Sequence, residues 1–414
     1  MAHRTSQDIR YLHRFEVMRR FYADAENRTR QELAAATGLS FATVANLTAE
    51  LIDAGVLVES GRQDSGGGRP RTLLAVNAER GALIGVDVAE TSVRTELFDL
   101  ALRELHAEER PLPPDDVEPG DVVARIEESI AVALEVTGTP RQRVLGVGVS
   151  VPGLVEREGG VSTYSPYWSW REVPMRSLLA ERIGMPLHLD NPLKASTLAE
   201  MWFGEGRGVD DLVVVTLRAG VGAGFAIGGA LYRGATNSAG EWGHTCLELD
   251  GRACRCGSRG CVEAYVGTRG ILETLRTVAP ADPLLQASDD TEALRGLALR
   301  AAQEDPVATE VITRTGRYLG AALGSLVNVF NPQVMVLGNQ VVQDLGAPLL
   351  SATRAALADH ALAQPLRAVD LRCSALSHNA VARGAAASAL EGFLGNREMF
   401  GPVSRTRGAR GRTK

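Results

Sequence analysis

The sequence predicts an α/β protein that consists of an N-terminal winged helix-turn-helix domain followed by a two-lobed α/β body. Two patterns carry this prediction. Residues 1–78 show helical apolar spacing and then a short pair of strands, whereas apolar strands alternate with helical segments from residue 80 onward. With 414 residues, the chain has the length of two or three domains. Its hydrophobic fraction of 45% and charged fraction of 23% are typical of a globular protein.

Composition and charge exclude a membrane bundle and a largely disordered chain. No uninterrupted apolar run reaches the roughly 18 residues of a membrane-spanning helix, and the first residues lack the apolar stretch of a secretory signal. We therefore expect a cytoplasmic protein without a membrane partner. The net charge is −6, yet residues 1–80 carry 11 arginines against 10 acidic side chains. A nearly neutral N-terminal part beside an acidic remainder favours contact of the N-terminal part with DNA.

The N-terminal part contains the elements of a winged helix-turn-helix in the expected order. Ser40 is a suitable N-cap for the third helix, and Gly55 would end it. The alternative is a small helical protein-interaction domain with a loop. It is less favoured because three glycines and Arg69-Pro70-Arg71 form a thin cationic wing. The expected elements are helices over 6–24, about 30–36 and about 41–54, and strands over 56–59 and 73–76.

The third helix and the wing are the elements expected to contact DNA. The helix exposes Ser40, Thr43 and Asn46 near its start, without a basic side chain, and the amide of Asn46 is suited to adenine. In the wing, Arg69 and Arg71 are expected to reach the minor groove and the phosphates. The segment 401–414 has five cations and no acidic residue, which predicts a disordered basic tail rather than a further DNA contact.

The remaining residues predict two α/β lobes, because strand-like apolar runs alternate with helical segments. We assign residues 80–198 to the first lobe, completed by a C-terminal helix over 378–395, and residues 199–377 to the second lobe. A further helix is expected near 121–136. The expected strands cover 82–88, 93–100, 144–151, 212–216 and 334–337.

A cluster of cysteines in the second lobe predicts a metal site. His244, Cys254, Cys256 and Cys261 follow the pattern His-x9-Cys-x-Cys-x4-Cys. One imidazole and three thiolates form a closed tetrahedral zinc site of the structural kind, with no position open to water. The alternative, in which these cysteines only pack, is less favoured. Cys246 is predicted to be a strand neighbour rather than a ligand, and the isolated Cys373 a core residue.

Several segments together resemble the ROK family, which contains bacterial sugar kinases and sugar-responsive repressors. With the winged helix in front, the resemblance covers about residues 28–395. It implies an actin-like, hexokinase-like fold of two lobes around a sugar cleft, and a homodimer or dimer of dimers. Two winged helix-turn-helix domains in one dimer in turn imply a palindromic operator. The segments are 239–244 (Ala-Gly-Glu-Trp-Gly-His), 254–263, 190–194 (Asp-Asn-Pro-Leu-Lys), 199–204, 220–224 and 331–332.

The same resemblance assigns the sugar hydroxyls to Asn191, Glu241, His244 and Glu263. Carboxylates that accept hydrogen bonds from sugar hydroxyls would reject analogues lacking those hydroxyls. His244 can bind the metal through one ring nitrogen and present the other to the sugar, so the metal would fix the orientation of the ring.

The groups needed for phosphoryl transfer are missing. Where the family's kinases have Asn-Asp, with a catalytic aspartate, this chain has Asn191-Pro192. The first phosphate loop, usually Asp-x-Gly-Gly-Thr, reads Asp87-Val-Ala-Glu-Thr, the second loop contains Arg218-Ala219, and the usual Gly-Gly is Gly338-Asn339. We therefore expect a sugar-responsive transcriptional repressor that is not an enzyme.

Two other functions remain open. One is an ATP-dependent sugar kinase with an appended DNA-binding head, in which Asp190 would be the nearest substitute carboxylate for the missing aspartate. The other is a zinc-dependent scaffold without a ligand. Phosphorylation assays distinguish the first alternative, and ligand-induced thermal stabilisation distinguishes the second.

Overall fold

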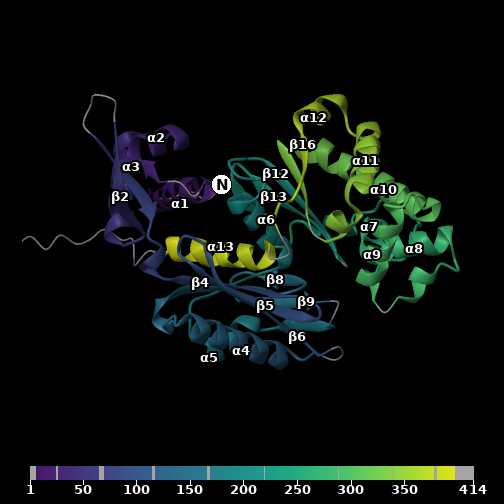
Figure 1. Ribbon diagram of the computed structural model, residues 1–414, viewed down its shortest axis with the longest axis horizontal. Helices are drawn as coiled ribbons and strands as arrows, with labels where there is room; N and C mark the ends of the chain where they lie inside the picture. Colours follow the sequence, from purple (N-terminus) through teal and green to yellow (C-terminus); the bar gives the residue numbers. More distant parts are fainter. Residues whose placement is uncertain are drawn as a thin grey trace, which may run out of the picture. The chain divides into compact units, whose positions relative to one another are not determined.

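The computed structural model of the protein describes residues 6–24, 27–64, 70–113, 117–165, 168–218, 220–287, 289–338, 340–376 and 380–396. The chain forms two compact units (Figure 1). The first comprises Met1–Gly81, Asp99–Arg103 and Leu390–Lys414, and the second comprises Ala82–Phe98 and Glu104–Ala389.

The first unit contains the winged helix-turn-helix. Helices α2 and α3 meet at 119°, which lies within the range of the motif, and Gly38 joins them in the left-handed conformation at φ 69°. Thr29 and Glu32 form a capping box at the start of α2. Ser40 caps α3, as predicted. The elements are α1 (Ser6–Asp24), β1 (Arg28–Thr29), α2 (Arg30–Thr37), α3 (Phe41–Asp53), β2 (Leu57–Gln63) and β3 (Arg71–Val76), with sheet order β1-β3-β2.

Two segments distant in sequence complete the first unit. The hydroxyl of Tyr22 donates to the Leu100 carbonyl at 2.7 Å, and the guanidinium of Arg14 donates to the Leu394 carbonyl at 2.9 Å. Both side chains are buried. The last turn of the C-terminal helix α13 (Ala380–Leu394), which the sequence assigned to the first lobe, is therefore grouped with this unit.

The second unit contains two five-stranded sheets that share one topology. In each sheet the first strand in sequence is central and has an antiparallel hairpin, β5–β6 or β13–β14, on one side. On the other side it pairs parallel with one later strand, which pairs parallel with another. The orders are β11-β7-β4-β5-β6 and β16-β15-β12-β13-β14, which indicates two equivalent lobes. A small sheet, β10-β9-β8, accompanies the first lobe. The α/β fold is thus confirmed.

The predicted strands of the second unit are present with small differences in length. In the first lobe they are β4 (Ala82–Val88), β5 (Ser92–Asp99), β6 (Glu104–Pro111), β7 (Val144–Ser150), β8 (Leu154–Glu156), β9 (Val161–Ser165), β10 (Trp170–Val173) and β11 (Leu187–Asp190). In the second lobe they are β12 (Leu212–Leu217), β13 (Val221–Ile227), β14 (Ala230–Tyr232), β15 (Val334–Gly338) and β16 (Asp370–Cys373).

Helices cover both faces of the first sheet (Figure 1). Ile84 and Val86 of β4 belong to the core that includes α4, whereas Gly85 and Gly148 face α13 so closely that a Cβ atom would collide with its backbone. Besides α13, the α-helices of the second unit, in both lobes, are α4 (Pro119–Thr137), α5 (Met175–Ile183), α6 (Pro192–Phe203), α7 (Glu263–Val266), α8 (Thr268–Val278), α9 (Asp290–Ala301), α10 (Pro306–Phe330), α11 (Gln340–His360) and α12 (Ala363–Ala368).

Among the described residues, no single helix has the length and apolarity to cross a membrane. Only α2 and α3 taken together pass such a test, and they are the bent pair of the helix-turn-helix.

Candidate functional site

The predicted metal ligands lie together in the second unit. One ligand atom from each of His244, Cys254, Cys256 and Cys261 falls within 4.8 Å of the others. Cys246 is not part of this cluster. It forms an isolated antiparallel bridge with Cys261, as expected for a strand neighbour. Cys373 packs against the hydrophobic core of the second lobe and is only partly buried, so the prediction of a core residue holds in part.

The separations within the cluster fit a tetrahedral ion. Bonds of about 2.3 Å to sulfur and about 2.0 Å to nitrogen place two sulfurs about 3.8 Å apart, and a sulfur and a nitrogen about 3.5 Å apart. Here Sγ of Cys256 and Sγ of Cys261 are 3.7 Å apart, and Sγ of Cys254 is 3.6 Å from Nδ1 of His244. The nitrogen directed at the cluster is Nδ1, which leaves Nε2 for another partner.

Short backbone turns explain how so few residues supply the ligands. The Cys254 amide donates to the Ser258 carbonyl at 2.9 Å, and the Gly257 amide donates to the Cys254 carbonyl at 3.1 Å. Gly257 has φ 91°, a conformation that side chains disfavour. His244 ends a short 3₁₀ helix (Glu241–His244) that follows Gly240, whose φ is 108°. Glu241 and His244 are therefore fixed on the same turn.

Glu263 joins the metal cluster to the loop between β12 and β13. Its Oε2 accepts a hydrogen bond from the Val221 amide at 3.1 Å, while Oε1 lies 3.8 Å from Sγ of Cys254. Since Cys254 also contacts His244, the structure brings Glu241, His244 and Glu263 into one region. These are three of the four predicted sugar ligands.

Asn191, the fourth predicted sugar ligand, is buried at the start of α6. Its Oδ1 caps the helix by accepting from the Lys194 amide at 3.0 Å. The Lys194 side chain is fully buried, and its ammonium donates to the Ala239 carbonyl just before Glu241. Burial lowers the pKa of Lys194, and the nearby charges of Asp190 and Glu241 oppose this shift. Lys194 thus connects the Asn191 and Glu241 segments.

Asp190, the possible substitute base, is held by other side chains. Its Oδ2 is ion-paired with Arg233, and its Oδ1 accepts from Nδ2 of Asn237 at 3.1 Å and from the Asn191 amide at 3.0 Å. Both members of the ion pair are largely buried. A carboxylate with these partners is poorly placed to remove a proton from a sugar. Pro192 occupies the first turn of α6, where its missing amide hydrogen costs nothing.

Charged side chains of the protein itself occupy the region of the altered phosphate loops. Nη1 of Arg218 lies 4.0 Å from Oδ2 of Asp87. Burial raises the pKa of Glu90, and three arginine charges, those of Arg255, Arg218 and Arg269, oppose the shift. A triphosphate placed here would meet two carboxylates.

The predicted DNA-contacting residues of α3 share one exposed end. Oγ of Ser40 accepts from the Thr43 amide at 3.1 Å and lies 2.8 Å from Oγ1 of Thr43, so both hydroxyls also serve the helix cap. Asn46 is exposed, and Arg71 is exposed on β3. Arg69 and the segment 401–414 lie outside the described residues, as do Ala219 and Asn339. The exposed ring of Phe41, at 54%, is an additional candidate for contact with DNA.

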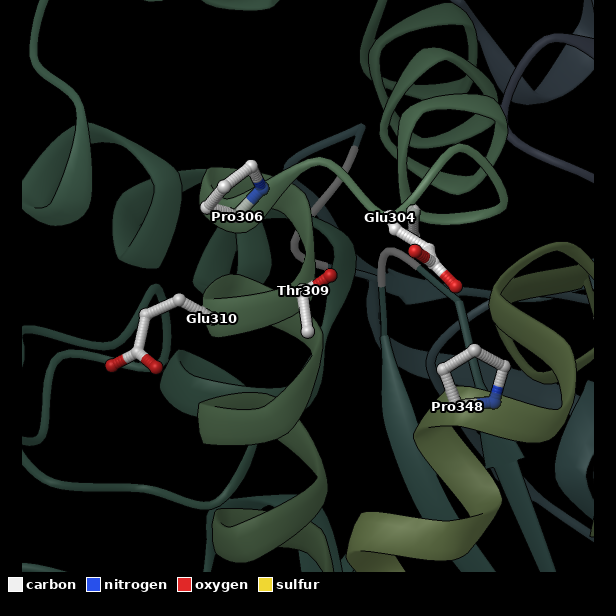
Figure 2. A pocket seen from close by; sticks show the side chains of 6 residues that line it. Glu304, Pro306, Thr309, Glu310 and Pro348 are labelled. Atoms are coloured by element: carbon white, nitrogen blue, oxygen red, sulfur yellow. The ribbon is translucent and has the colours of Figure 1, made fainter.

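The second unit also has a surface depression that is separate from the predicted metal and sugar ligands. Figure 2 shows the depression among the end of α9, the start of α10 and the kinked α11. None of the predicted functional residues lines it. The lining residues are Ala301, Glu304, Pro306, Thr309, Glu310 and Pro348.

Comparisons with known proteins agree with the residue patterns. The family model described as "ROK family" matches residues 83–391. The chain is similar to the "Xylose repressor" of Caldicellulosiruptor bescii, with 31% identity over 316 residues, 75% of this chain and 79% of the relative. It also resembles two crystal structures. One is a ROK family transcriptional regulator described as a homolog of E. coli MLC protein (TM-score 0.77, 24% identity, 94% and 97% covered). The other is a ROK family glucokinase from Streptomyces griseus in complex with glucose and AMPPNP (TM-score 0.65, 29% identity, 74% and 98% covered).

Proposed function

The chain belongs to the ROK family, and from this premise we propose that it is a sugar-responsive transcriptional repressor and not a sugar kinase. The observation that carries the proposal is a contrast around Asn191. Two of the predicted sugar ligands, Glu241 and His244, share a turn that the buried Lys194 links to the Asn191 segment, whereas the position of the base is Pro192 and the adjacent carboxylate is ion-paired with Arg233. The winged helix-turn-helix supplies the DNA-binding part.

We propose that the His244 cluster holds Zn²⁺. The ion would be structural, because four protein ligands leave no position for water. Through Nδ1 it would fix the His244 ring with Nε2 directed away from the metal, and it would hold the turns that carry Glu241 and Glu263. Sugar binding and metal binding would then depend on the same segment.

For the effector, we propose a pentose or hexose bound by Asn191, Glu241, His244 and Glu263. The similar protein named as a xylose repressor makes D-xylose the first sugar to test, and the glucokinase complex makes D-glucose the second. Carboxylates and an imidazole suit neutral hydroxyls, which both donate and accept hydrogen bonds.

For DNA, we propose that two copies of the chain bind a palindromic operator through Ser40, Thr43 and Asn46 of α3, with Arg71 and Arg69 on the backbone and minor groove. A homodimer, or a dimer of dimers, would present two heads to two half-sites separated by whole helical turns. Sugar binding would alter closure of the lobes and thereby the spacing of the heads. The expected outcome is release of DNA.

Fluorescence anisotropy tests this function. Labelled DNA from the region upstream of the protein's own coding sequence is mixed with the protein and titrated with D-xylose, D-glucose and N-acetyl-D-glucosamine. Release by one of these sugars and not by the others is the expected result. A scaffold would show neither release nor thermal stabilisation. For a sugar-binding protein, by contrast, a sugar at 100 times its dissociation constant would add about 2.7 kcal/mol to the free energy of unfolding.

A further inference from the structure

Three polar residues form a row across the first sheet at the carboxyl ends of its parallel strands. Asp87 of β4 pairs with Ser150 of β7, and Ser150 pairs with Asp190 of β11. Neighbouring strands are about 4.8 Å apart, so the two aspartates lie about 10 Å from each other with the serine between them. Ligands of open α/β sheets bind at such strand ends.

The two aspartates of this row differ in their partners. Asp190 is bound by Arg233, Asn237 and a backbone amide. Asp87 is 5% exposed, yet its Oδ1 has no hydrogen-bond partner among the described residues. Oγ of Ser150 is likewise buried without a partner, at 1% exposure. Two adjacent buried polar groups without partners are costly in a folded protein unless a ligand or water satisfies them.

Arg218 restricts which ligand can satisfy them. Its Nη1 lies 4.0 Å from Oδ2 of Asp87, too far for a hydrogen bond but close enough to balance the charge. A phosphate in this space would be repelled by Asp87, and an ammonium group would be repelled by Arg218. A neutral hydroxyl suits both, because it donates to a carboxylate and accepts from a guanidinium or from a serine hydroxyl.

The same loop connects this space to the proposed sugar site. The Arg218 side chain faces Asp87, and the Val221 amide, three residues later in the chain, donates to Glu263. On the other side, Ser150 neighbours Asp190, which precedes Asn191. The unpartnered groups therefore lie between segments that carry two of the proposed sugar ligands.

We propose that Asp87, Ser150 and Arg218 form a second part of the effector site, which binds a free hydroxyl of an unphosphorylated sugar and rejects a phosphate at that position. This inference rests on the proposed function and deepens it by naming the effector as a neutral sugar. Asp87 and Ser150 contact the hydroxyl, and Arg218 balances the charge of Asp87.

Calorimetric titration with D-xylose and with D-glucose tests the proposal. For the sugar that binds the wild type, Asp87→Asn is expected to weaken affinity at least tenfold, and Ser150→Ala to weaken it by a smaller factor. The matched control is Asp282→Asn, which removes another buried carboxylate that is ion-paired with Arg300 at 2.6 Å in the second lobe. Its sugar affinity is expected to remain at the wild-type value.

Melting of the sugar-free proteins supplies an independent readout. Because Oδ1 of Asp87 is buried without a hydrogen-bond partner among the described residues and Arg218 is 4.0 Å from Oδ2, Asp87→Asn is expected to raise the melting temperature, whereas Asp282→Asn is expected to lower it. A lower melting temperature for Asp87→Asn would mean that Oδ1 of Asp87 is satisfied within the folded protein, and it would overturn the proposal.

Affinities separate this inference from the proposed function. Wild-type affinity in both Asp87→Asn and Ser150→Ala, together with loss of binding in Glu241→Ala, would mean that the row binds water only and would overturn this inference alone. Failure of the wild type to bind either sugar would overturn the proposed function and this inference with it. Equal or tighter binding of D-glucose 6-phosphate than of D-glucose by the wild type would contradict the neutral-hydroxyl assignment.

Discussion

The metal cluster and the strand ends of the first sheet differ in what they retain for chemistry. The segment from Glu241 to Glu263 contains all four predicted metal ligands and three of the four predicted sugar ligands, and the separations among the metal ligands suit a tetrahedral ion. At the strand ends, the position of the base is Pro192, and Asp190 is ion-paired. Arg218 stands opposite Asp87.

This difference shows how a kinase-like fold can serve as a sensor. Binding needs groups that match the hydroxyls of the sugar, whereas phosphoryl transfer also needs a base and a site for the charge of the triphosphate. The first set can persist after the second is lost, because different residues supply them.

Loss of a metal ligand should have the largest effect. Cys256→Ser removes one of three thiolates from a site whose binding energy in small zinc domains is on the order of 10 kcal/mol. We expect elemental analysis to find less than one zinc per chain, together with a lower melting temperature. Cys246→Ser is the matched control, since Cys246 is exposed and outside the cluster. One zinc per chain in Cys256→Ser would show that the ligand set is wrong.

Breaking the ion pair at Asp190 should have the next largest effect. Arg233→Met leaves a buried carboxylate without its cation, which typically costs about 3–5 kcal/mol. Chemical denaturation measures this loss. Arg314→Met breaks an exposed pair with Glu310 and should cost less than about 1 kcal/mol. Equal stability of the two variants would mean that Arg233 does not hold Asp190.

Removal of a proposed sugar-binding carboxylate should lower the affinity for sugar and leave the affinity for DNA unchanged. Glu241→Ala removes a charged acceptor, and such hydrogen bonds contribute roughly 1.5–3 kcal/mol, so sugar affinity should fall about ten- to a hundredfold. DNA affinity without sugar should not change. The control, Glu273→Ala, removes an exposed carboxylate of α8. Release of DNA from Glu241→Ala at the sugar concentration sufficient for the wild type would place the effector elsewhere.

The wing should show the smallest effect. Arg71→Ala removes one exposed cation and should weaken operator binding several-fold, with a fall of about 1 in the slope of affinity against salt. The control is Arg103→Ala, another exposed arginine that is paired with Asp99. Anisotropy titrations at several salt concentrations measure the slope, and an unchanged slope in Arg71→Ala would remove this residue from the DNA interface.

Features encoded over short stretches could be predicted from the sequence, and pairings between distant residues could not. The cap at Ser40 and the His244 cluster follow from local spacing, and the structure contains both. The Arg233–Asp190 pair joins residues 43 positions apart, so no local pattern revealed it. The hydrogen bond from Arg14 to the Leu394 carbonyl joins residues 380 positions apart. The role of Lys194, which links the Asn191 and Glu241 segments, was not predicted. Its only signal in the sequence is that lysine is rare, with Lys194 one of two.

Whether the protein senses its sugar without phosphorylating it is tested by following the sugar itself. The wild-type protein is incubated with ATP, magnesium and the sugar that releases DNA, and the sugar is then analysed by mass spectrometry while anisotropy records DNA binding. We expect full release of DNA, also without ATP, and recovery of the sugar in unmodified form. Phosphorylated sugar in excess over the protein, or release that requires ATP, would contradict it.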